Sequence, residues 1–225
     1  MPRSLVSILL LGLAASGCAH AGPPVSAEEH DRRAAAEEEA AAVPPCDASL
    51  PPSAVCWSDV EHPGASDRVS AEEHRRHAAE HRAAAAALRE AEASACTGIA
   101  DADRDMSPFE HRADIASVTT LEREEHAGRA TFRRRVGASV VFRARPGMTA
   151  AWLQRLVDCH LARNAAQGWT DLGMDDCPLA IAAVRAHVRE VHAGFAIDVE
   201  SDDSATADEI VRRAQAATAP MAPTP

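Results

Sequence analysis

The chain has 225 residues, of which 34 are acidic and 23 are basic, so its formal net charge at pH 7 is -11. This acidic balance argues against nucleic acid as a partner, because binding to phosphates requires a basic face. The chain has no Tyr, four Phe and three Trp, so its core must be built mainly from aliphatic side chains. Its length suits one domain with additional segments.

Residues 1–17 have the organisation of a secretory signal. Arg3 precedes an apolar segment over residues 5–13, and small residues follow up to Cys18. An apolar segment this short does not make a stable transmembrane helix, which needs about 20 residues. The segment is therefore predicted to direct export and then to be removed.

Residues 14–18, with the sequence AASGC, resemble the lipobox of bacterial lipoproteins. The resemblance implies cleavage before Cys18 and lipidation of its thiol, and several acyl chains together give stable attachment to a lipid bilayer. In such lipoproteins an Asp after the cysteine directs retention in the inner membrane, whereas this chain has Ala19. The resemblance thus implies an outer membrane lipoprotein that faces the periplasm. The alternative is an ordinary secretory signal followed by an unmodified cysteine.

Residues 18–95 are predicted to form a tether and a helical stalk. The sequence VSAEEH occurs at residues 25–30 and 69–74, and in each copy Ser precedes Glu by three residues, as in a capping box. Helices are therefore expected over residues 27–42 and 71–95, joined by a Pro-rich irregular linker. Because Ala, Glu and Arg dominate them, the helices are expected either to stand in solvent or to pack together through small side chains.

Residues 96–218 are predicted to form an α+β domain. Alternating apolar and polar residues indicate strands over 115–122, 138–145, 184–188 and 195–199. One amphipathic helix is expected over residues 149–167, ended by Gly168, and another from Thr206, with Glu209 completing a capping box. The order ββαββα predicts a two-layer domain with an antiparallel sheet covered on one side. A disordered tail is expected over residues 219–225.

Three segments with the sequences ACTGI, DMSPF and CHLARN, at residues 95–99, 105–109 and 159–164, resemble uncharacterised cell-envelope lipoproteins of Gram-negative bacteria. The resemblance extends over about residues 69–217. It implies no established activity and no catalytic residue.

Five cysteines follow the predicted lipidation site, and cysteines in an exported protein are first expected to form disulfides. An odd number leaves one thiol free or paired with another chain. We predict the local pairs Cys46 with Cys56 and Cys159 with Cys177, leaving Cys96 unpaired, although sequence alone does not define connectivity.

His74, His77 and His81 form a candidate metal site. Spacings of three and four place them on one helix face, where imidazoles can share Zn²⁺, Cu²⁺ or Ni²⁺. The sequence fixes no carboxylate or thiol beside them. The alternative is a solvated face, because an Ala-rich helix needs polar residues merely to remain hydrated.

Cys159 and His160 are neighbours in a predicted helix, so their side chains point about 100° apart and cannot act together as nucleophile and base. His160 is instead expected to be buried and bonded to a backbone carbonyl. A site that combines Cys96, Cys159 and Cys177 with His160 or His111 stays an open alternative, without support from a CxxC spacing.

Two further groups of charged residues have both a binding and a structural interpretation. Asp101, Asp103 and Asp105 begin like a calcium loop, but Met106 and Arg112 stand where an EF-hand needs Gly and Glu, so a polar turn is expected. Arginines are predicted to line the open sheet face, where they would hold an anionic partner or pair with Asp198 and Glu200. These arginines are Arg143, Arg145, Arg185 and Arg189.

The sequence therefore predicts a non-catalytic lipoprotein that contacts another component of the cell envelope. The alternative is a periplasmic metal-binding or metal-sensing protein that uses the three histidines. No enzyme is predicted, because the chain lacks a Gly-rich phosphate loop, a G-x-S-x-G elbow and a paired-carboxylate signature.

Overall fold

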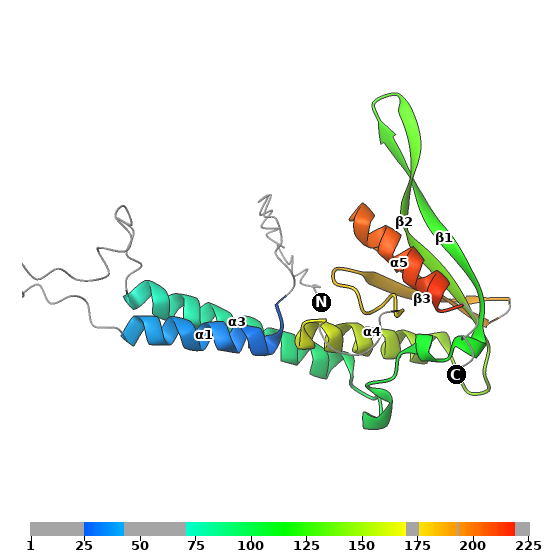
Figure 1. The fold of residues 1–225 in the computed structure, drawn as a ribbon. Helices are drawn as coiled ribbons and strands as arrows, with labels where there is room; N and C mark the ends of the chain where they lie inside the picture. Colours follow the sequence, from blue (N-terminus) through cyan, green and yellow to red (C-terminus); the bar gives the residue numbers. More distant parts are fainter. Residues whose placement is uncertain (1–24, 43–70, 170–175, 193, 219–225) are drawn as a thin grey trace, which may run out of the picture.

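The computed structural model describes residues 25–42, 71–169, 176–192 and 194–218 (Figure 1). They form a pair of long helices that adjoins an α+β domain. The predictions for the signal segment, for Cys18, for Cys46 with Cys56 and for the tail concern residues outside these ranges. Among the described helices, none combines the length and apolar character needed to span a membrane.

Helices α1 (Ala27–Ala42) and α3 (Ala71–Ala95) begin and end where the sequence predicts. They pack side by side in opposite directions, and α3 continues beyond α1 to contact the α+β domain (Figure 1). The hydroxyl of Ser26 accepts a hydrogen bond from the Glu29 amide at 3.0 Å, which confirms the predicted cap of the first helix. A local sequence signal therefore defines where the first helix of this hairpin begins.

Buried alanines form the contact between α1 and α3. Ala27 and Ala34 of α1 and Ala78 and Ala85 of α3 are almost fully buried, and within each helix they are seven residues apart. Seven residues are two helical turns, so these small side chains recur on one face and let the two backbones approach closely. Of the two arrangements expected for these helices, packing through small side chains is the one observed.

The α+β domain has the predicted order ββαββα and an antiparallel sheet. The sheet order is β1-β2-β4-β3, so the last two strands pair with each other and the fourth lies beside the second. The strands and helices are β1 (Ile115–Ala127), β2 (Ala130–Arg143), α4 (Ala150–Gln167), β3 (Arg185–Val191), β4 (Gly194–Glu200) and α5 (Ser204–Ala216).

One hydrophobic core joins the two helices of the domain to the sheet. Alternate residues of the central strands point into it, as the period of a strand requires, and they meet the apolar faces of α4 and α5. The core includes Val140 and Phe142 of β2, Phe195, Ile197 and Val199 of β4, Leu153, Leu156 and Val157 of α4, and Ile210 and Val211 of α5. The predicted two-layer α+β architecture is therefore confirmed.

The ends of α4 agree with the sequence, whereas the start of α5 does not. Thr149 caps α4 by accepting a hydrogen bond from the Trp152 amide, and Gly168 ends it in the left-handed conformation. Helix α5 is capped by Asp203, whose carboxylate accepts from the Thr206 amide at 2.7 Å. The predicted capping box of Thr206 with Glu209 is thus wrong, because Asp203, a stronger cap than Thr, caps the helix three residues earlier.

Strands β1 and β2 are longer than predicted. Strand β4 pairs with β2 only over residues 137–143, so the strand residues farther out have no third strand beside them in the described structure. We call residues 122–135 the arm. Figure 1 shows it as a twisted two-stranded ribbon that projects beyond the helices and the rest of the sheet.

A bulge lies at the base of the arm. Leu121 pairs with Gly137 and Glu122 pairs with Arg135, so Val136 is an extra residue on β2. Val136 is buried, and its carbonyl accepts a hydrogen bond from the Ser201 amide at 2.9 Å. Bulges bend a strand and increase its twist, so this one redirects the arm away from the sheet.

Candidate functional site

The predicted metal ligands His74, His77 and His81 do not converge on one point. The Nδ1 atoms of His74 and His77 are 2.6 Å and 3.9 Å from Glu37 Oε2. The Nδ1 atom of His81 instead lies 3.0 Å from Nδ1 of His30. Within the described ranges, no group of three or more His, Cys, Asp or Glu side chains is placed to hold a metal ion. The packing of α1 divides the histidines between two partners.

Polar contacts alternate with the alanine layers of the helical hairpin. His30 lies three residues after a buried Ala of α1 and meets His81, and Glu37 occupies the equivalent position one heptad later and meets His74. Burial and the nearby His81 lower the pKa of His30, and the hydrogen bond from His74 lowers the pKa of Glu37. Polar residues between packed helices specify one register, so these pairs align α1 with α3.

The structure contains a disulfide between Cys96 and Cys159. Cys96 directly follows α3, and Cys159 lies on α4, against which α3 packs. The predicted pair of Cys159 with Cys177 is therefore wrong, as is the unpaired Cys96. The prediction paired cysteines that are close in sequence, whereas helix packing brings together two cysteines that are 63 positions apart.

Cys177 is a buried free thiol in the core. Its Sγ atom lies 3.1 Å from Ser107 Oγ and 3.9 Å from Nε2 of His160. Burial raises the pKa of the Cys177 thiol and lowers the pKa of His160 to about 4. Because a nucleophilic cysteine needs its thiolate form, this environment favours a packing role for the group over an activated nucleophile.

His160 is buried, as predicted, and it makes the domain sensitive to acid. Its side chain must stay neutral in the folded state, with a pKa of about 4, whereas an unfolded His protonates near about 6.5. Stability from this group is therefore complete above the unfolded pKa and is lost as the pH falls towards the folded pKa. The loss between pH 7 and pH 5 is about 2 kcal/mol.

This acid sensitivity is tested by chemical denaturation at both pH values. We expect His160→Gln to remove most of that difference, whatever the variant's stability at neutral pH. An unchanged difference between the two pH values would assign the acid sensitivity to other groups.

The Asp residues that resemble a calcium loop lie in a polar turn. Residues Asp101–Asp103 form a single 3-10 turn, which confirms that expectation. Asp101 pairs with Arg104 at 3.1 Å, and Asp105 pairs with Arg163 of α4. Arginines rather than a shared cation therefore neutralise these two carboxylates.

The four arginines predicted on the sheet all have partners within the chain. Arg185 pairs with Asp202 at 2.9 Å, and Arg189 pairs with Asp198 at 2.8 Å. Near the end of β2, Arg143 donates to the Ala113 carbonyl and Arg145 pairs with Asp114. These contacts favour internal pairing over an anion site.

A mainly apolar pocket lies between the turns that precede β1 and one end of α4. Its empty volume, including solvent at its mouth, is about 450 Å³. His111 and Arg143 add polar groups to its lining. The remaining lining residues are Met106, Pro108, Asp114, Phe142, Met148, Trp152, Leu153 and Leu156.

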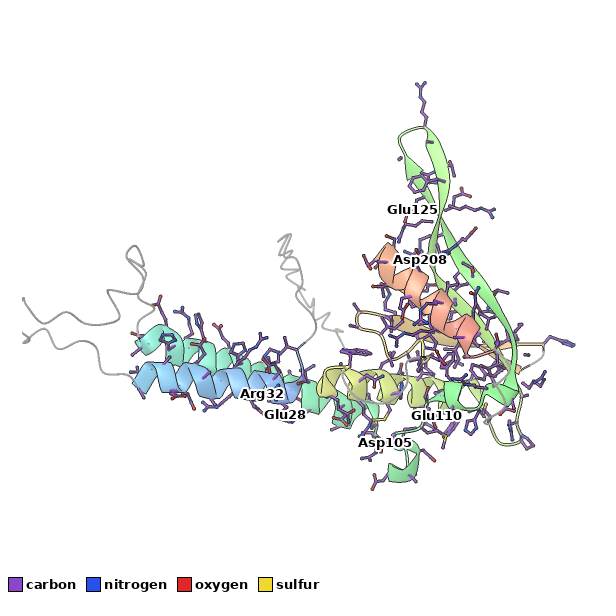
Figure 2. The ribbon with its side chains drawn as sticks, in the orientation of Figure 1. Glu28, Arg32, Asp105, Glu110, Glu125 and Asp208 are labelled. Carbon is purple, nitrogen blue, oxygen red and sulfur yellow. A yellow bond between two sulfur atoms is a disulfide. The ribbon has the colours of Figure 1, made fainter. Side chains whose placement is uncertain are left out.

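The residues of the arm are exposed, except Glu125 and Arg134, which are half-buried. Phe132 is 46% exposed, and among the described residues no other large hydrophobic side chain is classed as exposed. It stands opposite Glu125 on the neighbouring strand, and Figure 2 shows Glu125 on the arm. Two-stranded ribbons alone are marginally stable in water, so a projecting ribbon that also exposes an aromatic ring suits a contact surface.

Ion pairs hold the base of the arm in place. Arg135 pairs with Asp208 of α5 at 2.5 Å, and Figure 2 shows Asp208 on that helix. Across the arm, Arg134 pairs with Glu125 at 2.6 Å. Nearer the sheet, Arg123 pairs with Glu200 and Asp202. The base is thereby fixed to the domain, while the tip extends beyond these contacts.

No family model, curated protein or solved structure matches the chain. The fold defines it as an α+β protein with an N-terminal helical hairpin. Its arm is the candidate contact surface.

Proposed function

We propose that this protein is a non-catalytic lipoprotein of the cell envelope, anchored in the outer membrane through acylated Cys18 and facing the periplasm. The order of charged, apolar and small residues before Cys18 supports export and lipidation. The disulfide between Cys96 and Cys159 supports an oxidising compartment, because such bonds persist outside the cytosol.

The arm is the observation that carries the interaction function. Among the described residues, no further strand pairs with its two strands, and its exposed Phe132 stands opposite Glu125. Strand edges bind other chains through backbone hydrogen bonds, and aromatic side chains are enriched where proteins meet. The partner that this surface suits is another protein of the envelope.

The helical hairpin does not separate the anchor from the α+β domain. Ser26, just before α1, lies against Gly168 at the end of α4, and it follows Cys18 by only eight residues. At 1.5 Å per residue, α3 is about 37 Å long, and its C-terminal end is tied to α4 by the disulfide. The hairpin is therefore a rigid projection from the domain, and the eight residues 18–25 form the link between the proposed anchor and the domain.

Replacement of the lipidated cysteine tests the anchor. We expect Cys18→Ala to move the protein from the membrane fraction to the soluble periplasmic fraction, because the acyl chains supply its membrane affinity. Cys177→Ala is the matched control and should remain with the membrane. Fractionation followed by intact-mass measurement checks both variants, and a Cys18→Ala protein that still sediments with membranes would contradict the anchor.

A further inference from the structure

We propose that His30 and His81 form a two-imidazole site that binds a divalent transition-metal ion, of the class of Zn²⁺, between α1 and α3. The site extends beyond the proposed interaction function and does not depend on it. It also differs from the site predicted on α3 alone, because one of its ligands comes from the other helix.

The distance between the two imidazoles fits a shared metal. Their Nδ1 atoms are 3.0 Å apart, and the ring centroids are 5.2 Å apart at an interplanar angle of 43°. Zinc lies about 2.0–2.1 Å from each His nitrogen, so two nitrogens of a tetrahedral site are about 3.3 Å apart. A small separation of the rings, of about 0.3 Å, therefore makes room for the ion.

Packing presets the positions of both ligands. His30 follows buried Ala27 by three residues, and His81 follows buried Ala78 by three residues, so the alanine contacts that join the helices also bring the imidazoles together. Because the ligands are held before the ion arrives, binding does not have to order the two helices. The ion would join residues 51 positions apart in the chain.

The nearby charged groups leave the imidazoles as the principal ligands. On α1, Glu29 pairs with Arg32 and Arg33, and Asp31 pairs across the interface with Arg89. With these carboxylates occupied by arginines, water completes the coordination of the ion. A two-ligand site is consistent with the lack of a larger ligand group among the described residues.

The contact between the two Nδ1 atoms is also compatible with metal binding. A neutral ring carries one proton, and when that proton is on Nε2 the Nδ1 lone pair is free for a metal. In the metal-free contact, one Nδ1 donates to the other, so binding requires only a change of tautomer in the donor ring.

Titration of the full mature chain with Zn²⁺ tests the site, with calorimetry for affinity and stoichiometry. We expect one ion per chain, and binding at least about tenfold weaker in His30→Ala and in His81→Ala, since even outer-shell losses weaken metal sites on that scale. His77→Ala, which alters a half-buried histidine on α3, the helix of His81, is the matched control and should bind as the unmodified chain does.

Circular dichroism of each variant shows whether the helices still form, and the Ala substitutions suit a hairpin already packed through alanines. In the unmodified chain, Zn²⁺ should also shift the NMR signals of both His30 and His81 imidazoles together. Unchanged binding in the folded His81→Ala variant would overturn the proposal. So would loss of binding only in His77→Ala, which would return the site to α3 alone, or an absence of binding to the unmodified chain.

Discussion

Replacement of Cys96 and Cys159 together by Ser is expected to lower the free energy of unfolding by on the order of 4 kcal/mol. The disulfide closes a loop between residues separated by 63 positions. Without it, the unfolded chain regains the conformational freedom that the bond removes. The variant should melt about 10 °C lower, given the usual relation between stability and melting temperature for chains of this size.

The same experiment identifies which cysteines are bonded. A reducing agent should lower the melting temperature of the unmodified protein and of Cys177→Ala to a similar extent, because both proteins contain the disulfide between Cys96 and Cys159. The reducing agent should not change the melting temperature of the double variant, because this variant lacks the disulfide observed among the described residues. If Cys177→Ala lost its sensitivity to reduction, the observed pairing would be contradicted.

Gly137→Ala is expected to destabilise the domain by about 3 kcal/mol or more, because it combines backbone strain with a steric conflict. Gly137 has a φ angle of 154°, and a Cβ atom there would lie 1.9 Å from the Val199 carbonyl oxygen. That oxygen belongs to the backbone of β4, so it cannot turn aside as a side chain could. Urea denaturation measures the loss.

Gly128→Ala is the matched control for this prediction. Gly128 lies at the turn of the arm with a φ angle of 62°, and no atom would lie within 4 Å of an added Cβ. Its substitution should therefore cost only the backbone strain, about 1 kcal/mol. Equal losses in the two variants would show that the contact at the base of the arm has no special role.

The sequence predicted the parts of the fold that local signals determine. Capping serines and helix-forming composition gave the bounds of α1 and α3, and alternating apolar residues gave the order of strands and helices in the domain. Thr149 and Gly168 marked the ends of α4 because a cap depends on a few neighbouring residues. Burial on one face leaves such a periodic pattern wherever a strand lies on the core.

The arm could not be predicted in the same way, because neither of its faces is buried against the core. Its residues are charged on both faces, so they lack the alternation that identified the other strands. The signal that was present is charge pairing around Gly128, where Glu122 stands opposite Arg135 and Glu124 opposite Arg133. Such cross-strand pairs are weak individually.

The pairings of Cys96 with Cys159 and of His30 with His81 were missed for a shared reason. Each depends on how one helix lies against another, and sequence patterns within a single helix do not specify that. The repeat placed a histidine at the same point of both helices, but only antiparallel packing with a defined register shows that His30 meets His81 and not His74.

The central claim, that the arm is the surface through which this protein contacts the envelope, is tested most directly by photo-crosslinking in living cells. A photoreactive amino acid replaces Phe132 on the arm or, as a control, exposed Ala87 on α3, in a chain that keeps Cys18. The account predicts a protein adduct of one defined mass from position 132 and none from position 87. The absence of an adduct at position 132, or the same adducts from both positions, would contradict it.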